Sequence, residues 1–240
     1  MKKKIIVIGC GEHSRVVIEN LEQQNKYTIF GLVSEKKSDV GKKVNGYRVI
    51  CEDKDLKKML SNNKDIKGYI LGVGLVNGGM NKRLEVSKKI STFLNPINVI
   101  HPTAIISKKS SLGLGNVIEA FTKISGSAVV RNHCVIQSFT SINHDIILED
   151  NVLIATNVTL AGKRIGANSV IADGASISFK KNVGKNCLLM IGTHIAHDCI
   201  IGNNVVIANS AAIAGHAEIG DQVIIGGNCG VQQFTRIGKM

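Results

Sequence analysis

Two histidine-aspartate pairs are the residues of this chain whose types and spacing could carry chemistry. They are His144-Asp145 and His197-Asp198. A histidine with a pKa near its ordinary value of ~6.5 can take a proton from an attacking amine or hydroxyl group at neutral pH. An adjacent carboxylate can hold the imidazole in one tautomer and stabilise the imidazolium that forms. Either pair could therefore supply a general base, and the alternative for each is a solvated surface pair.

The residues around both pairs follow a six-residue period. Every sixth residue from Ile100 to Ile237 is Ile, Leu or Val, with a single step of five between Leu160 and Ile165. An aliphatic-glycine pair also recurs every 18 residues, beginning at Ile165-Gly166. Three hexapeptides therefore make one coil, and the pattern predicts a parallel β-helix whose aliphatic side chains fill a narrow prism. Both histidines occupy the third hexapeptide of their coils, three coils apart, which predicts a separation of about 14 Å along the axis.

The composition agrees with a layered aliphatic core. Only 4% of the 240 residues are aromatic, whereas 44% are hydrophobic, and there are two prolines. This balance excludes a disordered or collagen-like chain. No apolar run approaches the ~20 residues that span a bilayer. The apolar stretch Ile5–Ile8 ends at Gly9 and is too short for a signal peptide, so we expect a cytoplasmic protein.

The six cysteines form no C-x-x-C pair, so zinc-ribbon spacing is absent and we expect no bound metal. Four of them occupy the small-residue position two before the aliphatic one, where we expect them to pack in the core: Cys134, Cys187, Cys199 and Cys229.

The formal net charge of +12 is uneven along the chain, since +9 of it lies in residues 1–100. The excess consists mostly of lysine pairs without interleaved aromatic residues, which gives no stacking surface for nucleic-acid bases. We therefore expect a lysine-rich surface suited to anionic small ligands or an acidic carrier, and no nucleic-acid partner.

Residues 1–95 predict a separate small α/β domain. An apolar strand at Ile5–Ile8 ends in Gly9-Cys10-Gly11 and is followed by a helical stretch, and further strands are predicted at Tyr27–Val33 and Tyr69–Val73. Helices are predicted at Asp55–Leu60 and Asn81–Phe93. A Gly-x-Gly turn between a strand and a helix can bring backbone N–H groups close to a phosphate, although a simple tight turn is the alternative. The fold class is therefore a small Rossmann-like N-terminal domain followed by a β-helix over residues 96–240.

A first family resemblance covers nearly the whole chain. It rests on these motifs: Gly9-Cys10-Gly11-Glu12-His13, Ser34-Glu35, Gly72-Val73-Gly74, His101-Pro102-Thr103-Ala104 and Asn143-His144-Asp145. They resemble the sugar O-acyltransferase family typified by sialic acid O-acetyltransferases and the UDP-4-amino-sugar N-acetyltransferases of bacterial glycan synthesis. Glu12 stands where that family has a glycine, and Leu153 stands where it has a second histidine.

A second resemblance covers Asn186–Lys239. The run from Leu188 to Cys199, with Ala214-Gly215-His216 and Val231-Gln232-Gln233-Phe234, is similar to the UDP-N-acetylglucosamine acyltransferases that begin lipid A synthesis. The resemblance places His197 at that family's catalytic base, beside Asp198. It places His194 and His216 at substrate-binding histidines, and Gln232 replaces another histidine.

The resemblances imply a left-handed β-helix, a homotrimer, and acetyl transfer from acetyl-CoA to a nucleotide-linked sugar with His144 and Asp145 as the catalytic pair. No tightly bound cofactor is implied. The implied substrate-binding residues of the first domain are Gly9, Gly11, His13, Glu35 and Gly72.

The alternative function is acylation of UDP-N-acetylglucosamine or a related sugar from an acyl carrier protein, with His197 as the base. A carbonic anhydrase is disfavoured because His-x-x-x-x-His spacing is absent, and a structural β-helix or nucleotide-sugar sensor remains a non-enzymatic alternative.

Overall fold

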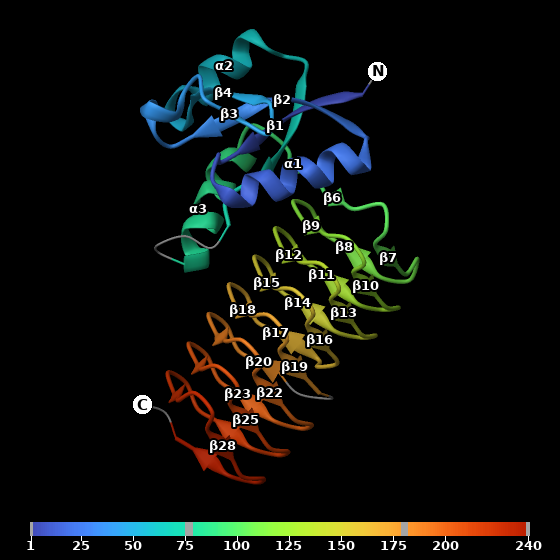
Figure 1. Ribbon diagram of the computed structural model, residues 1–240, viewed down its shortest axis with the longest axis vertical. Coiled ribbons are helices and arrows are strands. Elements are labelled where there is room, and N and C mark those ends of the chain that lie inside the picture. The colour runs from blue at the N-terminus through green and yellow to red at the C-terminus, as the bar shows by residue number, and fades with distance from the viewer. Residues whose placement is uncertain (1, 75–78, 179–181, 239–240) are drawn as a thin grey trace. The chain divides into compact units, whose positions relative to one another are not determined.

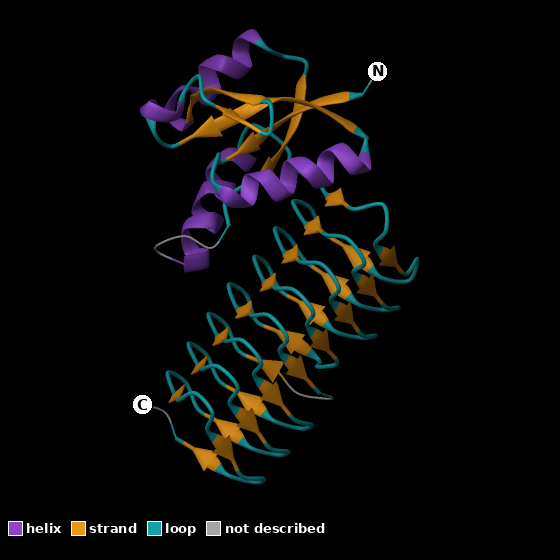
Figure 2. Ribbon diagram, in the orientation of Figure 1, coloured by secondary structure: helices purple, strands orange, loops and turns teal. Residues whose placement is uncertain are grey.

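The computed structural model describes residues 2–74, 79–178 and 182–238, which form two compact units. The first unit comprises Met1–Pro102 with Leu114–Val117, and the second comprises Thr103–Gly113 with Ile118–Met240. Figure 1 colours the chain by residue number, and Figure 2 shows helices together with strands in one unit and short strands joined by turns in the other. No helix among the described residues has the length and apolarity to cross a membrane.

The first unit is built on a five-stranded sheet in the order β3-β4-β2-β1-β5. Its strands are β1 (Lys3–Ile8), β2 (Tyr27–Ser34), β3 (Lys43–Val44), β4 (Tyr47–Glu52) and β5 (Ile66–Leu71). All neighbouring pairs are parallel except the hairpin of β3 and β4. Its helices are α1 (Glu12–Gln24), α2 (Leu56–Asn62) and α3 (Gly79–Ser91), with 3₁₀ turns at Lys37–Asp39 and Asp53–Asp55.

The β-α-β alternation read from the sequence is confirmed, because β1 and β2 are apolar runs whose side chains are buried among the helices. Ile6, Val33 and Leu71 belong to one cluster with Leu56 of α2. The third strand predicted from the sequence is β5, which ends at Leu71, two residues before the predicted end at Val73. The hairpin of β3 and β4 was not predicted, although its Asn45-Gly46 turn is a hairpin signal: both residues have positive φ.

The hexapeptide repeats form three parallel sheets of eight strands each, which wind as the stacked coils coloured from green to red in Figure 1. The first sheet contains β6 (Val99–Ile100), β9 (Val117–Ile118), β12 (Val135–Ile136), β15 (Leu153–Ile154), β18 (Val170–Ile171), β21 (Leu188–Leu189), β24 (Val206–Ile207) and β27 (Ile224–Ile225). The second contains β7 (Ile105–Ile106), β10 (Lys123–Ile124), β13 (Ser141–Ile142), β16 (Thr159–Leu160), β19 (Ser176–Ile177), β22 (His194–Ile195), β25 (Ala212–Ile213) and β28 (Gly230–Val231). The third contains β8 (Ser111–Leu112), β11 (Val129–Val130), β14 (Ile147–Leu148), β17 (Arg164–Ile165), β20 (Asn182–Val183), β23 (Ile200–Ile201), β26 (Glu218–Ile219) and β29 (Arg236–Ile237).

The interior of the β-helix is aliphatic, as the period predicts. The second residue of most strands is fully buried, for example Ile154 and Leu160 at 0% exposure. Cys134, Cys187 and Cys199 are buried in the predicted small-residue position. The same prediction is wrong for Cys229, which is exposed because it lies in the last described coil, with no described coil on its far side.

The corners between strands are left-handed turns. The third residue after the buried aliphatic residue has positive φ in coil after coil, as at Asp145, Asn186 and His216. Asparagine, aspartate and glycine tolerate this conformation best, which explains their frequency at that position. At the corner after the third sheet, asparagine side chains also join successive coils: Asn168 donates to Asn186, and Asn186 donates to Asn204.

Candidate functional site

His144 and Asp145 lie at the corner that follows β13 in the second sheet. The Nδ1 atom of His144 is 2.6 Å from Oδ2 of Asp145, and both side chains are more than half exposed. Asp145 has a φ of 62°, so the left-handed turn presents its carboxylate next to the preceding imidazole. This is the geometry that a carboxylate needs to hold a histidine in the tautomer of a general base.

His197 and Asp198 lie at the same corner after β22. Their Nδ1 and Oδ2 atoms are 3.2 Å apart, and the Asp198 side chain is 29% exposed against 70% for Asp145. The strands β13, β16, β19 and β22 are consecutive neighbours in the sheet, which confirms that the two pairs stand three coils apart. At ~4.8 Å a coil the separation is about 14 Å, too far for one small substrate to use both pairs.

Three rings, those of His197, His216 and Phe234, contact one another in a column along this corner, running from the coil of His197 towards the C-terminus. The ring centroids of His197 and His216 are 5.1 Å apart, edge to face, and His216 stacks on Phe234 at 4.9 Å. The 18-residue coil length is the signal that could have placed these rings together. Asp198, His216 and Phe234 follow one another at intervals of 18 residues, and His197 directly precedes Asp198. The orientations of the rings could not have been read from the period.

Two shallow grooves flank this ring column. One, of about 610 Å³, is lined by residues that include His194, His197, Gly215, Gln232 and Gln233. The other, of about 440 Å³, is lined by Asp198, Ile200, His216, Glu218, Phe234 and Arg236. The structure therefore brings together the predicted residues His194, His197, Asp198 and His216.

Gly215 makes room for the His197 imidazole, because a Cβ atom at position 215 would lie 2.8 Å from Cε1 of His197. We expect Gly215→Ala to push the His197 ring away from His216 and to lower stability by less than about 1 kcal/mol, since a side-chain end can yield. Histidine-ring NMR spectra should show shifted His197 and His216 resonances, with those of His144 unchanged. Unchanged His197 resonances would contradict this expectation.

In the first unit, the predicted glycines shape the turn between β1 and α1. Gly9 has a φ of +105° and donates its N–H to the carbonyl of Val33 at 2.8 Å. Gly72 lies so close to α1 that a Cβ there would be 2.8 Å from Cβ of Ser14. Gly11 precedes α1, and the space around its Cβ position is open to 4 Å. Gly9 and Gly72 therefore have packing reasons to be glycine, whereas Gly11 leaves open space at the start of the helix.

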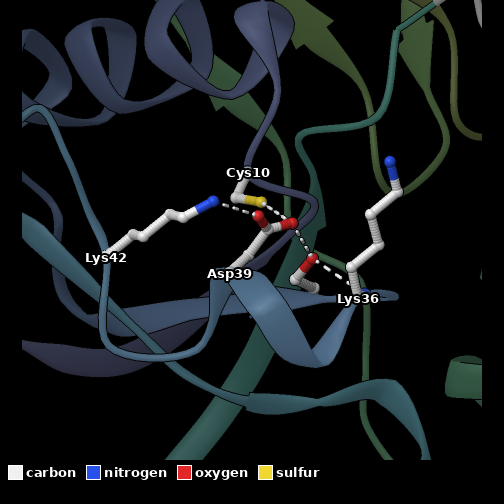
Figure 3. Close-up of polar contacts among 5 residues, drawn as sticks. Cys10, Lys36, Asp39 and Lys42 are labelled. Carbon is white, nitrogen blue, oxygen red and sulfur yellow. Dashed lines mark hydrogen bonds and ion pairs between the residues drawn. The ribbon is translucent and has the colours of Figure 1, made fainter.

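A polar cluster lies at the carboxyl ends of β1 and β2 (Figure 3). Asp39 accepts hydrogen bonds from Ser34 at 2.8 Å, Lys42 at 2.8 Å and Cys10 at 3.5 Å. The hydrogen bond from Lys42, with that from Ser34, lowers the pKa of Asp39 to about 2. Asp39 was not singled out in the sequence, because four residues separate it from Ser34 and only a turn of the chain brings the two side chains together.

Glu35, the acidic residue predicted to bind substrate, pairs with a different lysine. Its Oε2 atom lies 2.8 Å from Nζ of Lys82 in α3. The hydrogen bond and charge of Lys82 lower the pKa of Glu35. Burial raises the pKa of the Cys10 thiol, so this cysteine is not an activated thiolate.

His13, also predicted to bind substrate, lies in the first turn of α1 against Gly74. Burial, with the positive charge of Arg83, lowers its pKa to about 4. Its Nε2 atom is buried and has no hydrogen-bond partner among the described residues. The imidazole is therefore neutral at physiological pH and is poorly suited to binding a phosphate by charge.

The lowered pKa of His13 predicts a loss of stability in acid. The unfolded chain, with a histidine pKa of ~6.5, takes up the proton more readily than the folded chain, so stability falls as the pH drops from about 6.5 to about 4. Between pH 7 and pH 5 the loss from this residue is roughly 2 kcal/mol. Denaturant unfolding of wild type and His13→Leu at both pH values should show a smaller pH effect in the variant. Equal pH effects would show that His13 is not responsible.

Family models match both parts of the chain. Residues 4–90 match the PglD N-terminal domain, and residues 180–215 match the bacterial transferase hexapeptide (six repeats). A curated relative, GDP-perosamine N-acetyltransferase of Escherichia coli O157:H7, is 29% identical over 122 residues, which is 50% of this chain and 52% of the relative. The match thus spans about half the length of that relative.

Solved structures share the fold. The acetyltransferase domain of PglB from Neisseria gonorrhoeae FA1090, in complex with acetyl coenzyme A, has a TM-score of 0.70 at 23% identity and covers 95% of this chain and 98% of its own. A histidine-to-asparagine mutant of perosamine N-acetyltransferase from Caulobacter crescentus, in complex with CoA and GDP-perosamine, has a TM-score of 0.69 at 19% identity and covers 93% of both chains. UDP-N-acetylglucosamine acyltransferase from Campylobacter jejuni is 32% identical, with a TM-score of 0.56, over 58% of this chain and 62% of its own.

These findings confirm both resemblances read from the sequence. The chain combines a PglD-type N-terminal domain with the parallel β-helix of hexapeptide transferases, and the left-handed form that the resemblance implied is confirmed.

Proposed function

We propose that this chain transfers the acetyl group of acetyl-CoA to the amino or hydroxyl group of a nucleotide-linked sugar, with His144 as the general base. The observation that carries the proposal is the His144-Asp145 pair, whose Nδ1 and Oδ2 atoms lie 2.6 Å apart on the outside of a hexapeptide β-helix. The curated relative is named for N-acetylation of a nucleotide-linked amino sugar, and the two structural neighbours that match more than nine tenths of this chain hold CoA or its acetyl form.

The reaction requires one proton to move from the sugar, which accepts the acetyl group, to the sulfur of CoA, which gives it up. The lone pair of the sugar amine attacks the thioester carbonyl, and the imidazole of His144 takes the proton that the nitrogen loses. The tetrahedral oxyanion that forms requires hydrogen-bond donors, a role that backbone N–H groups of a neighbouring coil would fill. Collapse breaks the carbon–sulfur bond, and the imidazolium returns the proton to the thiolate, which leaves as CoA. Asp145 keeps the imidazole oriented and stabilises its protonated form.

The first unit would hold the nucleotide. Gly11 offers open space at the start of α1, where backbone N–H groups and the helix dipole favour a phosphate. Gly9 and Gly72 would support that turn, with Glu35 nearby at the end of β2 and His13 as a neutral buried neighbour. A homotrimer in the cytoplasm is the assembly and location that accompany the proposal.

The test is a direct assay with acetyl-CoA and nucleotide-linked sugars. The purified chain should release free CoA thiol in the presence of a UDP- or GDP-linked 4-amino sugar and should give a product heavier by one acetyl group. The same sugar already acetylated on nitrogen is the control and should not react if the amine is the acceptor. Absence of acetyl transfer to every amino and hydroxyl acceptor offered would overturn the proposal.

The groove beside His197 favours a second candidate function, acyl transfer from an acyl carrier protein to UDP-N-acetylglucosamine or a related sugar. His194 and His197 line this groove, and the Campylobacter jejuni relative is an acyltransferase of that sugar nucleotide. The lysine-rich chain would suit an acidic carrier. Donor competition separates the two candidates: the second requires an acyl-carrier thioester to outcompete acetyl-CoA.

A further inference from the structure

Three side chains with metal-binding atoms converge beside the ring column. His197, Asp198 and His216 each offer one ligand atom, and these atoms lie within 4.8 Å of one another. Within residues 2–74, 79–178 and 182–238 this is the one group of three or more histidine, cysteine, aspartate and glutamate side chains that meets this spacing. The sequence predicted no metal site, because the second histidine lies one coil further along the chain.

The β-helix itself holds these residues in place. Asp198 and His216 occupy equivalent corner positions in successive coils, each with a φ of 60°. The N–H of His216 donates to the carbonyl of His197 at 3.1 Å, which ties the two corners together. Gly215 leaves the face of the His197 ring uncovered by a side chain. The backbone positions are therefore set by coil stacking before any ion binds.

The donor set selects a class of ion. Two imidazoles and one carboxylate suit Zn²⁺, Co²⁺ and Ni²⁺, whereas Mg²⁺ and Ca²⁺ prefer sites made only of oxygen. At bond lengths of about 2.0–2.2 Å, two ligands of a tetrahedral ion lie roughly 3.4 Å apart. The side chains would close by about an ångström, which exposed rotamers allow.

The groove next to these side chains leaves room for a further ligand. It is lined by Asp198 and His216 and also by Glu218, whose carboxylate pairs with Arg236 at 3.4 Å. An ion bound by three protein ligands would thus face a space with room for a water molecule as the fourth ligand, as open zinc sites do, with the Glu218 carboxylate at its edge.

We propose that His197, Asp198 and His216 bind a divalent transition-metal ion of the zinc class. The site is separate from acetyl transfer at His144, which lies three coils away in the same sheet. An imidazole whose nitrogen binds the ion cannot accept a proton there, so metal occupancy would prevent the use of His197 as a base. The proposal needs neither of the two candidate functions to be correct.

The test uses the full chain after removal of metals with EDTA. Calorimetric titration with Zn²⁺ should give one ion per chain, and Co²⁺ should produce visible absorption bands of a low-symmetry site. His216→Asn and Asp198→Asn keep residues that tolerate the left-handed corner, and each should weaken binding at least tenfold. His144→Gln is the matched control, because it removes a histidine of an equivalent pair that forms no such cluster of three among the described residues, and it should bind the ion as wild type does.

In the titrations, either of two results would overturn the proposal: equal Zn²⁺ affinity in wild type and His216→Asn, or no binding by wild type in the millimolar range. Circular dichroism in EDTA checks that each variant is folded. A further measurement uses the wild-type chain alone and so does not depend on the folding of any variant. Substoichiometric Co²⁺ should broaden or shift the ring resonances of His197 and His216 before those of His144 and His194, and the opposite order would also overturn the proposal.

Discussion

Replacing His144 by glutamine is expected to lower kcat for acetyl transfer by roughly 10²- to 10⁴-fold, which is the usual contribution of a positioned general base. Glutamine cannot accept the proton of the attacking amine at neutral pH. Because the side chain is more than half exposed at a corner, its replacement should leave the free energy of unfolding within about 0.5 kcal/mol of wild type. Steady-state kinetics with acetyl-CoA and the best nucleotide-linked sugar measure the effect.

The matched variant for comparison is His197→Gln, which changes the same residue type at the equivalent corner three coils away. If His144 is the base, the decrease in kcat caused by His144→Gln is at least tenfold larger than any decrease caused by His197→Gln. The reverse order would move the reaction to His197 and favour the acyl-carrier candidate. Asp145→Asn should reduce kcat by less than His144→Gln, because it removes the carboxylate that orients the imidazole but leaves the base itself in place.

Replacing Gly184 by alanine is expected to destabilise the β-helix by about 3 kcal/mol, at the upper end for inserting one carbon atom into packed structure. Gly166, Gly184 and Gly202 stack in successive coils at the corner after the third sheet. A Cβ at Gly184 would overlap the carbonyl group of Gly202, and one at Gly166 would lie 2.5 Å from the carbonyl carbon of Gly184. Backbone cannot rotate away as a side chain can, so the coils must separate and weaken their shared hydrogen bonds.

The control for this prediction is Gly230→Ala, which adds the same methyl group to the same β-helix. No heavy atom lies within 4 Å of the Cβ position at Gly230, and its φ is not positive. Its stability should therefore stay within about 0.5 kcal/mol of wild type. Denaturant unfolding monitored by circular dichroism compares the two variants, and a Gly184→Ala protein as stable as Gly230→Ala would refute the close-packing argument.

The amino-acid sequence by itself determined the coils of the β-helix and the alternation of parallel strands and helices in the first unit, but neither the handedness of the β-helix nor the hairpin of β3 and β4. In a coil of three hexapeptides, a residue such as Ile154 must point inward because the prism has no other place for its side chain, so the period alone specifies strands, corners and core. The same counting located His144 and His197 at equivalent corners, and the apolar runs before Gly9 and Ser34 specified the parallel strands of the first unit. These features depend on residues close together in the chain.

Only the tertiary structure decided which side chains meet and how they are oriented. The His197–His216–Phe234 column arises because coil stacking brings together residues 18 or 19 positions apart, and their ring angles follow from packing, which the period does not describe. Ser34 and Asp39 meet only after a loop folds back. Burial makes His13 a neutral group with a pKa of about 4, whereas its motif alone suggested a binding role. Burial, ring orientation and hydrogen-bond partners depend on all neighbours at once, and so they required the folded chain.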